Sequence, residues 1–206
     1  MRHVRYVIIL VVLAMTFSSC TQKKNPQTCI LPKGCQLRAG DVVFRRGGGV
    51  TSYAVLVADP EGNYSHVGIV ADSAGKKIII HAVPGEPDYQ GDSDRVKADT
   101  PEHFFSTLYA SRGAICRHKD PDIAAKASKL ALQMFRAHVL FDHDYNLKDT
   151  TQMYCTELLA YVYSRAGSPL VSVTCGHDIN LPGIHARCLL PSDIYKSALL
   201  KHIISF

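Results

Sequence analysis

Three residues of this chain have the chemistry of a thiol-dependent active site: Cys155, His66 and His81. Cys155 stands where a polar segment gives way to an apolar, helical pattern, so its thiol is expected at a helix N-terminus. The unpaired N–H groups and the positive end of the helix dipole favour the thiolate there, which predicts a lowered thiol pKa. A nucleophilic cysteine also needs a neighbouring base, and that base needs a partner that holds its tautomer.

The two histidines lie on two predicted strands that a tight turn connects. Residues 65–70 read SHVGIV and residues 78–82 read IIIHA, with turn-forming residues between them. A turn near residues 74–75 brings His66 and His81 within a residue or two of cross-strand register. One imidazole can then take the thiol proton while the other orients it.

Each of these residues also has a structural interpretation when it is considered alone. A cysteine on an apolar helix is more often part of the core, where it behaves as a small hydrophobic residue. A single histidine on a strand is more often a hydrogen-bonded structural residue. The residue types and their spacing therefore predict a candidate thiol enzyme and nothing more specific.

The elements that must position these residues follow from hydrophobic periodicity and turn signals. The pattern predicts a small antiparallel sheet packed by two or three helices, which is an α+β fold. Three glycines at 47–49 lack the Lys-Ser/Thr of a nucleotide-binding loop and no helix is signalled after them, which predicts a flexible turn beside a groove. The expected strands cover 41–44, 65–70, 78–82 and 113–117, the helices 101–108, 123–139, 155–166 and 191–200 (with Ser192 as cap), and the loops 84–94, 142–152 and 171–188.

The composition describes an ordinary globular protein. Of 206 residues, 47% are hydrophobic and 20% are charged, and the formal net charge is +5. Disordered chains have fewer apolar residues and a larger charge imbalance, and a chain of this length suits one folded domain. The modest, unclustered positive charge excludes the dense basic surface of a nucleic-acid-binding protein.

The N-terminus has the pattern of a bacterial lipoprotein signal peptide. Arg2 and Arg5 precede an almost wholly apolar run over residues 6–17, and residues 18–20 read SSC. The run is shorter than the roughly 20 residues that a membrane-spanning helix needs. Cleavage before Cys20 and lipidation of its thiol would hold the chain in the cell envelope, on the periplasmic face or the outer surface of a membrane. An uncleaved anchor and a plain signal peptide are the alternatives.

These features divide the chain into a signal peptide (1–19), a lipidated tether (20–36) and a folded domain (37–206). The tether is polar and contains Cys29 and Cys35. In an oxidising compartment two cysteines at this spacing can form a disulfide, and a disulfide and two free thiols are both consistent with the sequence.

The motifs around the three candidate residues resemble the NlpC-type cell-wall cysteine peptidases. Residues 40–44 (GDVVF), 65–69 (SHVGI) and 80–82 (IHA) carry the first part of the resemblance. Both histidines precede the cysteine, and residues 141–146 (FDHDYN) lead into 154–158 (YCTEL), which is similar to the circularly permuted, YiiX-like branch of that superfamily. The resemblance covers residues 37–167 and implies a circularly permuted papain-like fold with a barrel-like sheet.

The resemblance also implies roles for individual residues. Cys155 matches the nucleophile, His66 the general base and His81 the orienting residue, and the backbone N–H of Cys155 matches the oxyanion donor. Glu157 follows the cysteine by two positions and is interpreted as structural. Further candidates for substrate or oxyanion binding lie near the cysteine and the first histidine: Tyr154, Ser65, Asp144 and Tyr145.

The function that the resemblance implies is an envelope hydrolase that cleaves an amide bond through an acyl-enzyme. The expected substrate is a peptidoglycan peptide or another small amide, with no cofactor. A lipid-directed acyltransferase or thioesterase of the same superfamily is one alternative, and an apolar groove would favour it. A non-catalytic, envelope-binding lipoprotein is another.

Two groups of residues have the ligand types of a metal site, and neither is expected to bind a metal. His66, His81 and Cys155 could themselves bind zinc, but they lack a carboxylate and a zinc-enzyme motif. A second set of thiols and imidazoles has the ligand types of a zinc site at unfamiliar spacings, and in the envelope its two cysteines can instead form a disulfide or remain free thiols. That set consists of Cys175, His177, His185 and Cys188.

Overall fold

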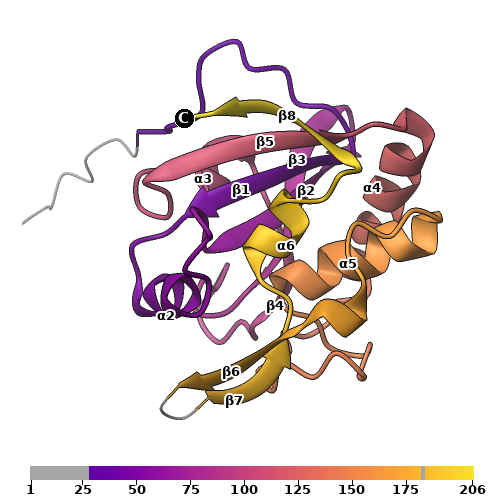
Figure 1. The fold of residues 1–206 in the computed structure, drawn as a ribbon. Helices are drawn as coiled ribbons and strands as arrows, with labels where there is room; N and C mark the ends of the chain where they lie inside the picture. Colours follow the sequence, from indigo (N-terminus) through magenta and orange to yellow (C-terminus); the bar gives the residue numbers. More distant parts are fainter. Residues whose placement is uncertain (1–27, 182–183) are drawn as a thin grey trace, which may run out of the picture.

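A six-stranded sheet forms the centre of the computed structural model, which describes residues 28–181 and 184–206 (Figure 1). The strand order is β4-β3-β2-β1-β5-β8, and every neighbouring pair is antiparallel. Helices and a separate hairpin, β6–β7, complete an α+β fold. The strands are β1 (Asp41–Arg46), β2 (His66–Ser73), β3 (Lys76–Val83), β4 (Arg95–Asp99), β5 (Arg112–His118), β6 (His177–Leu181), β7 (Ile184–Cys188) and β8 (Leu200–Ser205). The helices are α2 (Val50–Ala58), α3 (Pro101–Phe104), α4 (Pro121–Arg136), α5 (Cys155–Ala166) and α6 (Pro191–Tyr195), with a short 3₁₀ helix at Val173–Cys175.

The hairpin β2–β3 carries the two histidines and has the predicted turn. Ala74 and Gly75 both have positive φ angles, 48° and 77°, as a tight hairpin turn requires. Ile69 pairs with Ile80, so one step further along the register Gly68 faces His81. A Cβ at Gly68 would lie 2.7 Å from Cγ2 of Ile79 and 3.3 Å from Cβ of His81. The missing side chain therefore leaves the space in which the two histidines approach each other.

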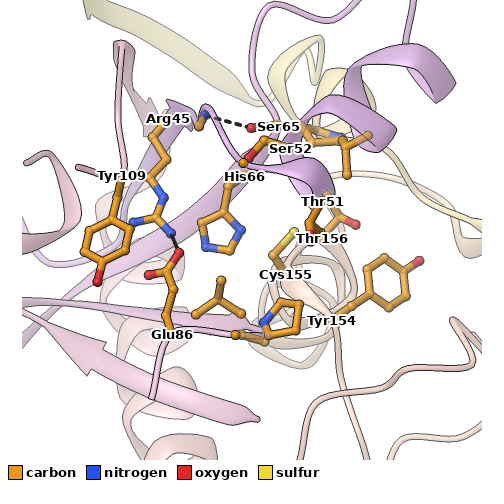
Figure 2. A pocket seen from close by; sticks show the side chains of 18 of the residues that line it. Arg45, Thr51, Ser52, Ser65, His66, Glu86, Tyr109, Tyr154, Cys155 and Thr156 are labelled. Atoms are coloured by element: carbon orange, nitrogen blue, oxygen red, sulfur yellow. Dashed lines mark hydrogen bonds and ion pairs between the residues drawn. The ribbon is translucent and has the colours of Figure 1, made fainter. Parts of the chain in front are cut away.

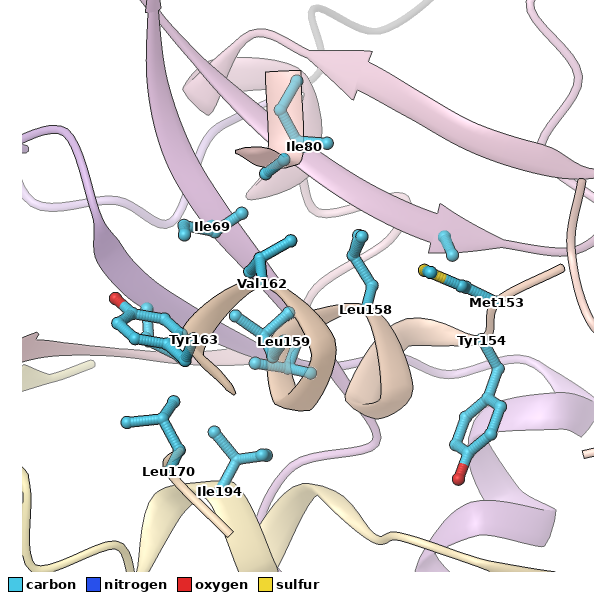
Figure 3. Close-up of a cluster of buried hydrophobic side chains, with 14 of the residues drawn as sticks. Ile69, Ile80, Met153, Tyr154, Leu158, Leu159, Val162, Tyr163, Leu170 and Ile194 are labelled. Atoms are coloured by element: carbon cyan, nitrogen blue, oxygen red, sulfur yellow. The ribbon is translucent and has the colours of Figure 1, made fainter. Parts of the chain in front are cut away.

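One face of the sheet packs against α4 and α5 and holds the larger part of the core. Helix α5 contributes Leu158, Leu159, Val162 and Tyr163, which are fully buried against strand residues such as Ile80 (Figure 3). The helix has the bounds that its periodicity predicts, and Gly167 ends it with a φ of 101°. Because α5 is fixed by this packing along its length, its first residue, Cys155, is held at a defined place beside the sheet.

The opposite face of the sheet carries a smaller apolar cluster and a row of polar residues. Residues 29–37 pack against this cluster, and the N–H of Ile30 donates to the carbonyl of Phe105 at 2.9 Å. The second half of the predicted tether is therefore part of the folded domain. Residues 1–27, which include the predicted signal peptide and Cys20, lie outside the described residues.

Several elements differ from the prediction. Helix α2 follows the three glycines directly. The sequence does not predict a helix there, because VTSYAVLVA has β-branched residues and no side-chain cap. The segment 171–188, expected to be irregular, forms the hairpin β6–β7. Strands β4 and β8 at the two sheet edges were not predicted. Ser192 lies inside α6, and Asp193 caps that helix by accepting the N–H of Leu190 at 2.7 Å.

Within the described residues, no helix combines the length and the apolar character needed to cross a membrane.

Candidate active site

A chain of hydrogen bonds joins side chains of three neighbouring strands. Nε2 of His66 on β2 lies 2.9 Å from Nδ1 of His81 on β3. Nε2 of His81 lies 2.9 Å from Oδ2 of Asp99 on β4. His81 is fully buried, and the ring of Phe104 packs against both imidazoles. The expected pair of histidines is therefore extended by a carboxylate into a row of three residues.

The tautomers of the two histidines follow from the ionisation state of Asp99. Burial raises the pKa of Asp99, but the hydrogen bond from His81 and the nearby charge of Lys97 outweigh it and hold the pKa well below its usual range. An ionised carboxylate only accepts hydrogen bonds, so Nε2 of His81 donates and its Nδ1 accepts. Nε2 of His66 must then donate to His81. The free lone pair of His66 is consequently on Nδ1, the ring nitrogen that can act as a base.

Both imidazoles are neutral in the resting protein. Burial is the largest cause that lowers the pKa of His66, and the positive charge of Arg45 lowers it further. Burial likewise lowers the pKa of His81, against the opposing effect of Asp99. A neutral His66 can accept a proton, which is the state that a general base requires.

Cys155 faces the same cavity as His66 at the first residue of α5 (Figure 2). The backbone N–H groups of Val67, Thr156 and Cys155 itself act on its sulfur, and Val67 is the residue after His66. Among the described residues, Cys155 forms no hydrogen bond with either ring nitrogen of His66. Catalytic hydrogen bonds are often long before substrate binds. The thiol of Cys155 must therefore move closer to His66 before it can transfer its proton.

The prediction of a lowered pKa for the Cys155 thiol is wrong. Burial raises the pKa of Cys155 to about 11, and this effect outweighs the three backbone N–H groups and the charge of Arg45, which all lower it. The loss of hydration destabilises the thiolate by more than the helix N-terminus stabilises it here. The resting site is therefore a neutral thiol beside a neutral imidazole.

We expect Cys155 to react slowly with iodoacetamide at neutral pH. With a pKa of about 11, only about one thiol in 10⁴ is ionised at pH 7, against a few per cent for an ordinary cysteine. Its alkylation rate should rise close to tenfold per pH unit up to about pH 10. Site-resolved mass spectrometry of pulse-labelled protein measures this rate, with an unstructured cysteine peptide as the reference. Rapid labelling at pH 6 would instead indicate a resting thiolate–imidazolium pair.

The cavity that contains Cys155 and His66 has a volume of about 520 Å³, large enough for a small organic ligand. Its walls come from the glycine segment and α2, from the end of β3, from the start of α5 and from the segment 188–191. Most of the lining is apolar. The structure thus confirms that the three glycines lie beside a groove.

The charged residues among those that line this cavity are Arg45 and Glu86, and they form an ion pair. The Arg45 guanidinium also donates to the carbonyl of Phe104 at 3.2 Å and stacks on the rings of Phe104 and Tyr109. Oε2 of Glu86 is buried and has no hydrogen-bond partner among the described residues. The two charges compensate each other, so the cavity offers a substrate little net charge.

Two of the proposed oxyanion or substrate-binding residues have structural partners. The hydroxyl of Tyr154 accepts the N–H of Leu189 at 2.8 Å and points away from Cys155 and His66 (Figure 2). Oγ of Ser65 accepts the N–H of Gly47 at 2.9 Å, which fixes the glycine segment to the start of β2. The structure therefore places both residues in the wall of the cavity, with their hydroxyl groups engaged in holding that wall.

Of the other two proposed binding residues, Tyr145 lines the cavity of Cys155 and Asp144 does not. Tyr145 lines the cavity, and its ring packs on that of Tyr154 with a centroid distance of 5.2 Å. Burial, followed by the charge of Cys155, raises the pKa of Tyr145 to about 12. Asp144 is exposed and lines a second depression near Arg187, which Tyr145 also lines. Asp142 is buried and accepts the N–H groups of Asp144 and residue 146, so it shapes the loop that leads to Cys155.

Glu157 has a structural role, as the sequence predicts. Its Oε2 accepts the N–H of Tyr154 at 3.4 Å and so caps the start of α5. Burial is the main cause that raises the pKa of Glu157 to about 8. The carboxyl group is therefore largely protonated at neutral pH.

We expect Glu157→Gln to protect the protein at alkaline pH. The native state holds the Glu157 proton up to about pH 8, whereas the unfolded chain loses it near its ordinary pKa of about 4.3, so the stabilisation declines as the pH rises between these values. Gln cannot ionise, so the melting temperature of the variant relative to the wild type should rise by at least about 3 °C from pH 5 to pH 8.5. Glu102→Gln, an exposed carboxylate in the first turn of α3, is the matched control. A pH-independent difference would contradict the raised pKa.

The cysteines of the described residues are free thiols, including the proposed pairs Cys29/Cys35 and Cys175/Cys188. Among the described side chains, no three His, Cys, Asp or Glu residues converge on a point that could hold a metal ion. The nitrogens of His66 and His81 that face each other lie 2.9 Å apart, at hydrogen-bonding distance. The side chain of His185 lies outside the described part of the structure.

Asp99, Arg45 and Glu86 are the site residues that sequence reasoning missed. Asp99 had a usable signal, because residues 95–99 read RVKAD and alternate charged and apolar side chains as a half-buried strand does. That alternation places Lys97 and Asp99 on one face. Arg45 and Glu86 lie in a strand end and a Pro-rich loop, and only the tertiary fold brings them together.

Comparison with known proteins identifies the fold. No known family profile and no curated protein sequence matches this chain significantly. A solved structure described as the metalloprotein yiiX from Escherichia coli O157:H7, of the DUF1105 group, superposes with a TM-score of 0.65. The match covers 84% of this chain and 99% of that chain at 15% sequence identity. At this identity the similarity shows the fold alone: the described chain is similar in fold to YiiX.

Proposed function

We propose that the protein is a cysteine hydrolase that cleaves an amide bond, with Cys155 as nucleophile and His66 as general base. The observation that carries the proposal is the hydrogen-bonded row from Asp99 through His81 to His66, which ends in the cavity that Cys155 lines. The YiiX-like fold and the order of the motifs support a circularly permuted papain-like enzyme.

The geometry suggests how the reaction proceeds. Nδ1 of His66 takes the thiol proton as the sulfur of Cys155 attacks the substrate carbonyl, and Asp99 stabilises the positive charge that develops on the histidines. The backbone N–H groups of Cys155 and Thr156 lie beside the sulfur and can donate to the oxyanion. The imidazolium then protonates the leaving amine, and the acyl-enzyme remains. His66 finally activates water, which hydrolyses the thioester and regenerates the thiol.

The motif resemblance favours a peptidoglycan peptide as substrate, with the protein lipidated at Cys20 and held in the cell envelope. The cavity favours a second candidate, the hydrolysis or transfer of an apolar acyl group. Its lining is mostly apolar, and its Arg45–Glu86 pair is internally neutralised. Such walls complement an acyl chain better than the carboxylates and amines of a peptidoglycan peptide.

One experiment tests both candidates. The full chain and its Cys155→Ala variant are incubated with defined muropeptides, with N-acyl amines and with acyl lipids, and the products are weighed by mass spectrometry. Cleavage of muropeptides by the parent alone would establish the amidase, and turnover of acylated compounds alone would establish the second candidate. Equal product with parent and variant, or no product from either, would contradict both and favour a binding lipoprotein.

A further inference from the structure

Helix α2 is an apolar surface element that stands at the mouth of the cavity. It holds no charged residue, and none of its nine residues is buried. Val50, Tyr53 and Val57 are 89%, 71% and 49% exposed. Leu108, which lines the same cavity as Val50, is 60% exposed. We call these four side chains the apolar rim.

The rim is held firmly in this exposed position. At the N-terminal end of α2, the N–H of Gly47 donates to the buried hydroxyl of Ser65 at 2.9 Å. At the C-terminal end, the buried carboxylate of Asp59 accepts the N–H of Ser192 at 3.0 Å. Two buried hydrogen bonds thus fix a helix whose outer face remains in water. Contiguous exposed apolar side chains of this kind mark sites that bind a partner or a membrane.

The start of the described chain lies next to Leu108, one member of this rim. The carbonyl of Thr28 accepts the N–H of Thr107 at 2.8 Å, and Thr107 precedes Leu108 of the rim. The eight Cα-to-Cα steps from Cys20 to Thr28 span at most about 28 Å, whereas a domain of this size measures about 40 Å across. A chain anchored at Cys20 must therefore turn the side that carries Thr28 and Leu108 towards the membrane.

We propose that the apolar rim docks onto a lipid surface and places the mouth of the cavity there. The occupant is a bilayer because the rim is apolar without charged side chains of its own, and because the chain that precedes it carries the apolar run 6–17 and the lipidation candidate Cys20. Tyr53 fits this placement, since an aromatic ring with a polar tip is typical of the membrane interface. Substrate would then enter the cavity from the lipid side, past Val50 and Leu108.

A tryptophan reporter tests the docking, because the chain contains no tryptophan of its own. The full chain with Tyr53→Trp is reconstituted in vesicles of phosphatidylethanolamine and phosphatidylglycerol, with and without bromine on the acyl chains. We expect the emission of this variant to shift to shorter wavelength and most of it to be quenched by brominated lipid. Gln133→Trp, on the exposed face of α4 at the opposite end of the molecule, is the matched control and should remain unquenched (Figure 1).

A charge on the rim supplies the second variant. Val57→Glu, added to Tyr53→Trp, is expected to abolish the quenching, because a charged side chain resists entry into the bilayer. The melting temperature should not fall, because Val57 is 49% exposed, and the cavity should stay intact, because Val57 does not line it. Equal quenching at positions 53 and 133, or none at 53, would overturn the proposal. A blue shift at position 53 that grows with protein concentration in the absence of vesicles would also overturn it, since a second copy of the chain would then cover the rim.

Discussion

Cys155→Ala and His66→Gln are each expected to reduce the turnover of the cleaved substrate by at least about a thousandfold. The first change removes the nucleophile. The second keeps a side-chain N–H that can donate to Nδ1 of His81 but cannot take the thiol proton. The loss should lie in kcat rather than in KM, because neither side chain is required to hold the apolar part of a substrate. Steady-state kinetics and intact-mass detection of the acyl-enzyme measure the two effects.

Cys188→Ala is the matched control for the nucleophile. Cys188 lines the same cavity, and burial raises the pKa of its thiol to about 11, as it does for Cys155. Among the described residues Cys188 forms no hydrogen bond with the row of His66, His81 and Asp99, and its cross-strand partner His177 bonds to Asp193 instead. Its removal should therefore leave turnover within about threefold of the wild type. A Cys155→Ala variant that keeps a tenth of the wild-type activity, or a mass adduct on Cys188, would show that Cys155 is not the nucleophile.

The elements that carry Cys155 and the two histidines could be predicted because their signals are local. Helix α5 has apolar residues at helical spacing and a glycine stop, and β2–β3 has a two-residue turn between apolar strands. Helix α4 lies within three residues of its predicted bounds, and its start is a local signal as well, because the Asp120 carboxylate accepts the N–H of Asp122 at 2.8 Å. Each of these elements contains its own stop signals, so no tertiary information was needed.

The missed elements depend on their neighbours. Strands β4 and β8 are short edge strands whose ladder hydrogen bonds are supplied by β3 and β5. Helix α2 is held by Ser65 and Asp59 rather than by signals within its own sequence. The direction of the Cys155 pKa shift was missed for a related reason. The helix terminus can be read from sequence, whereas the burial that outweighs it is a property of the folded site.

Asp99 is the residue on which the state of the whole row depends, and Asp99→Asn is expected to lower kcat by roughly 10²- to 10⁴-fold. An amide can donate as well as accept, so His81 is no longer forced to protonate Nε2. If His81 reverses its tautomer, His66 must carry its proton on Nδ1, and the lone pair that would accept the thiol proton is lost. The negative charge that stabilises the imidazolium is lost as well. KM should change little, since Asp99 does not line the cavity.

Asp88→Asn is the matched control, because Asp88 pairs with Lys97 and Arg95 at the same sheet edge without touching the histidines. Its kcat should stay within about threefold of the wild type. Nitrogen-15 chemical shifts of the imidazoles provide a readout that a merely structural role of Asp99 would not move. The wild type should show both His66 and His81 protonated on Nε2, and Asp99→Asn should move protons to Nδ1. Unchanged tautomers together with an unchanged kcat would remove Asp99 from the relay and leave His81 as its last member.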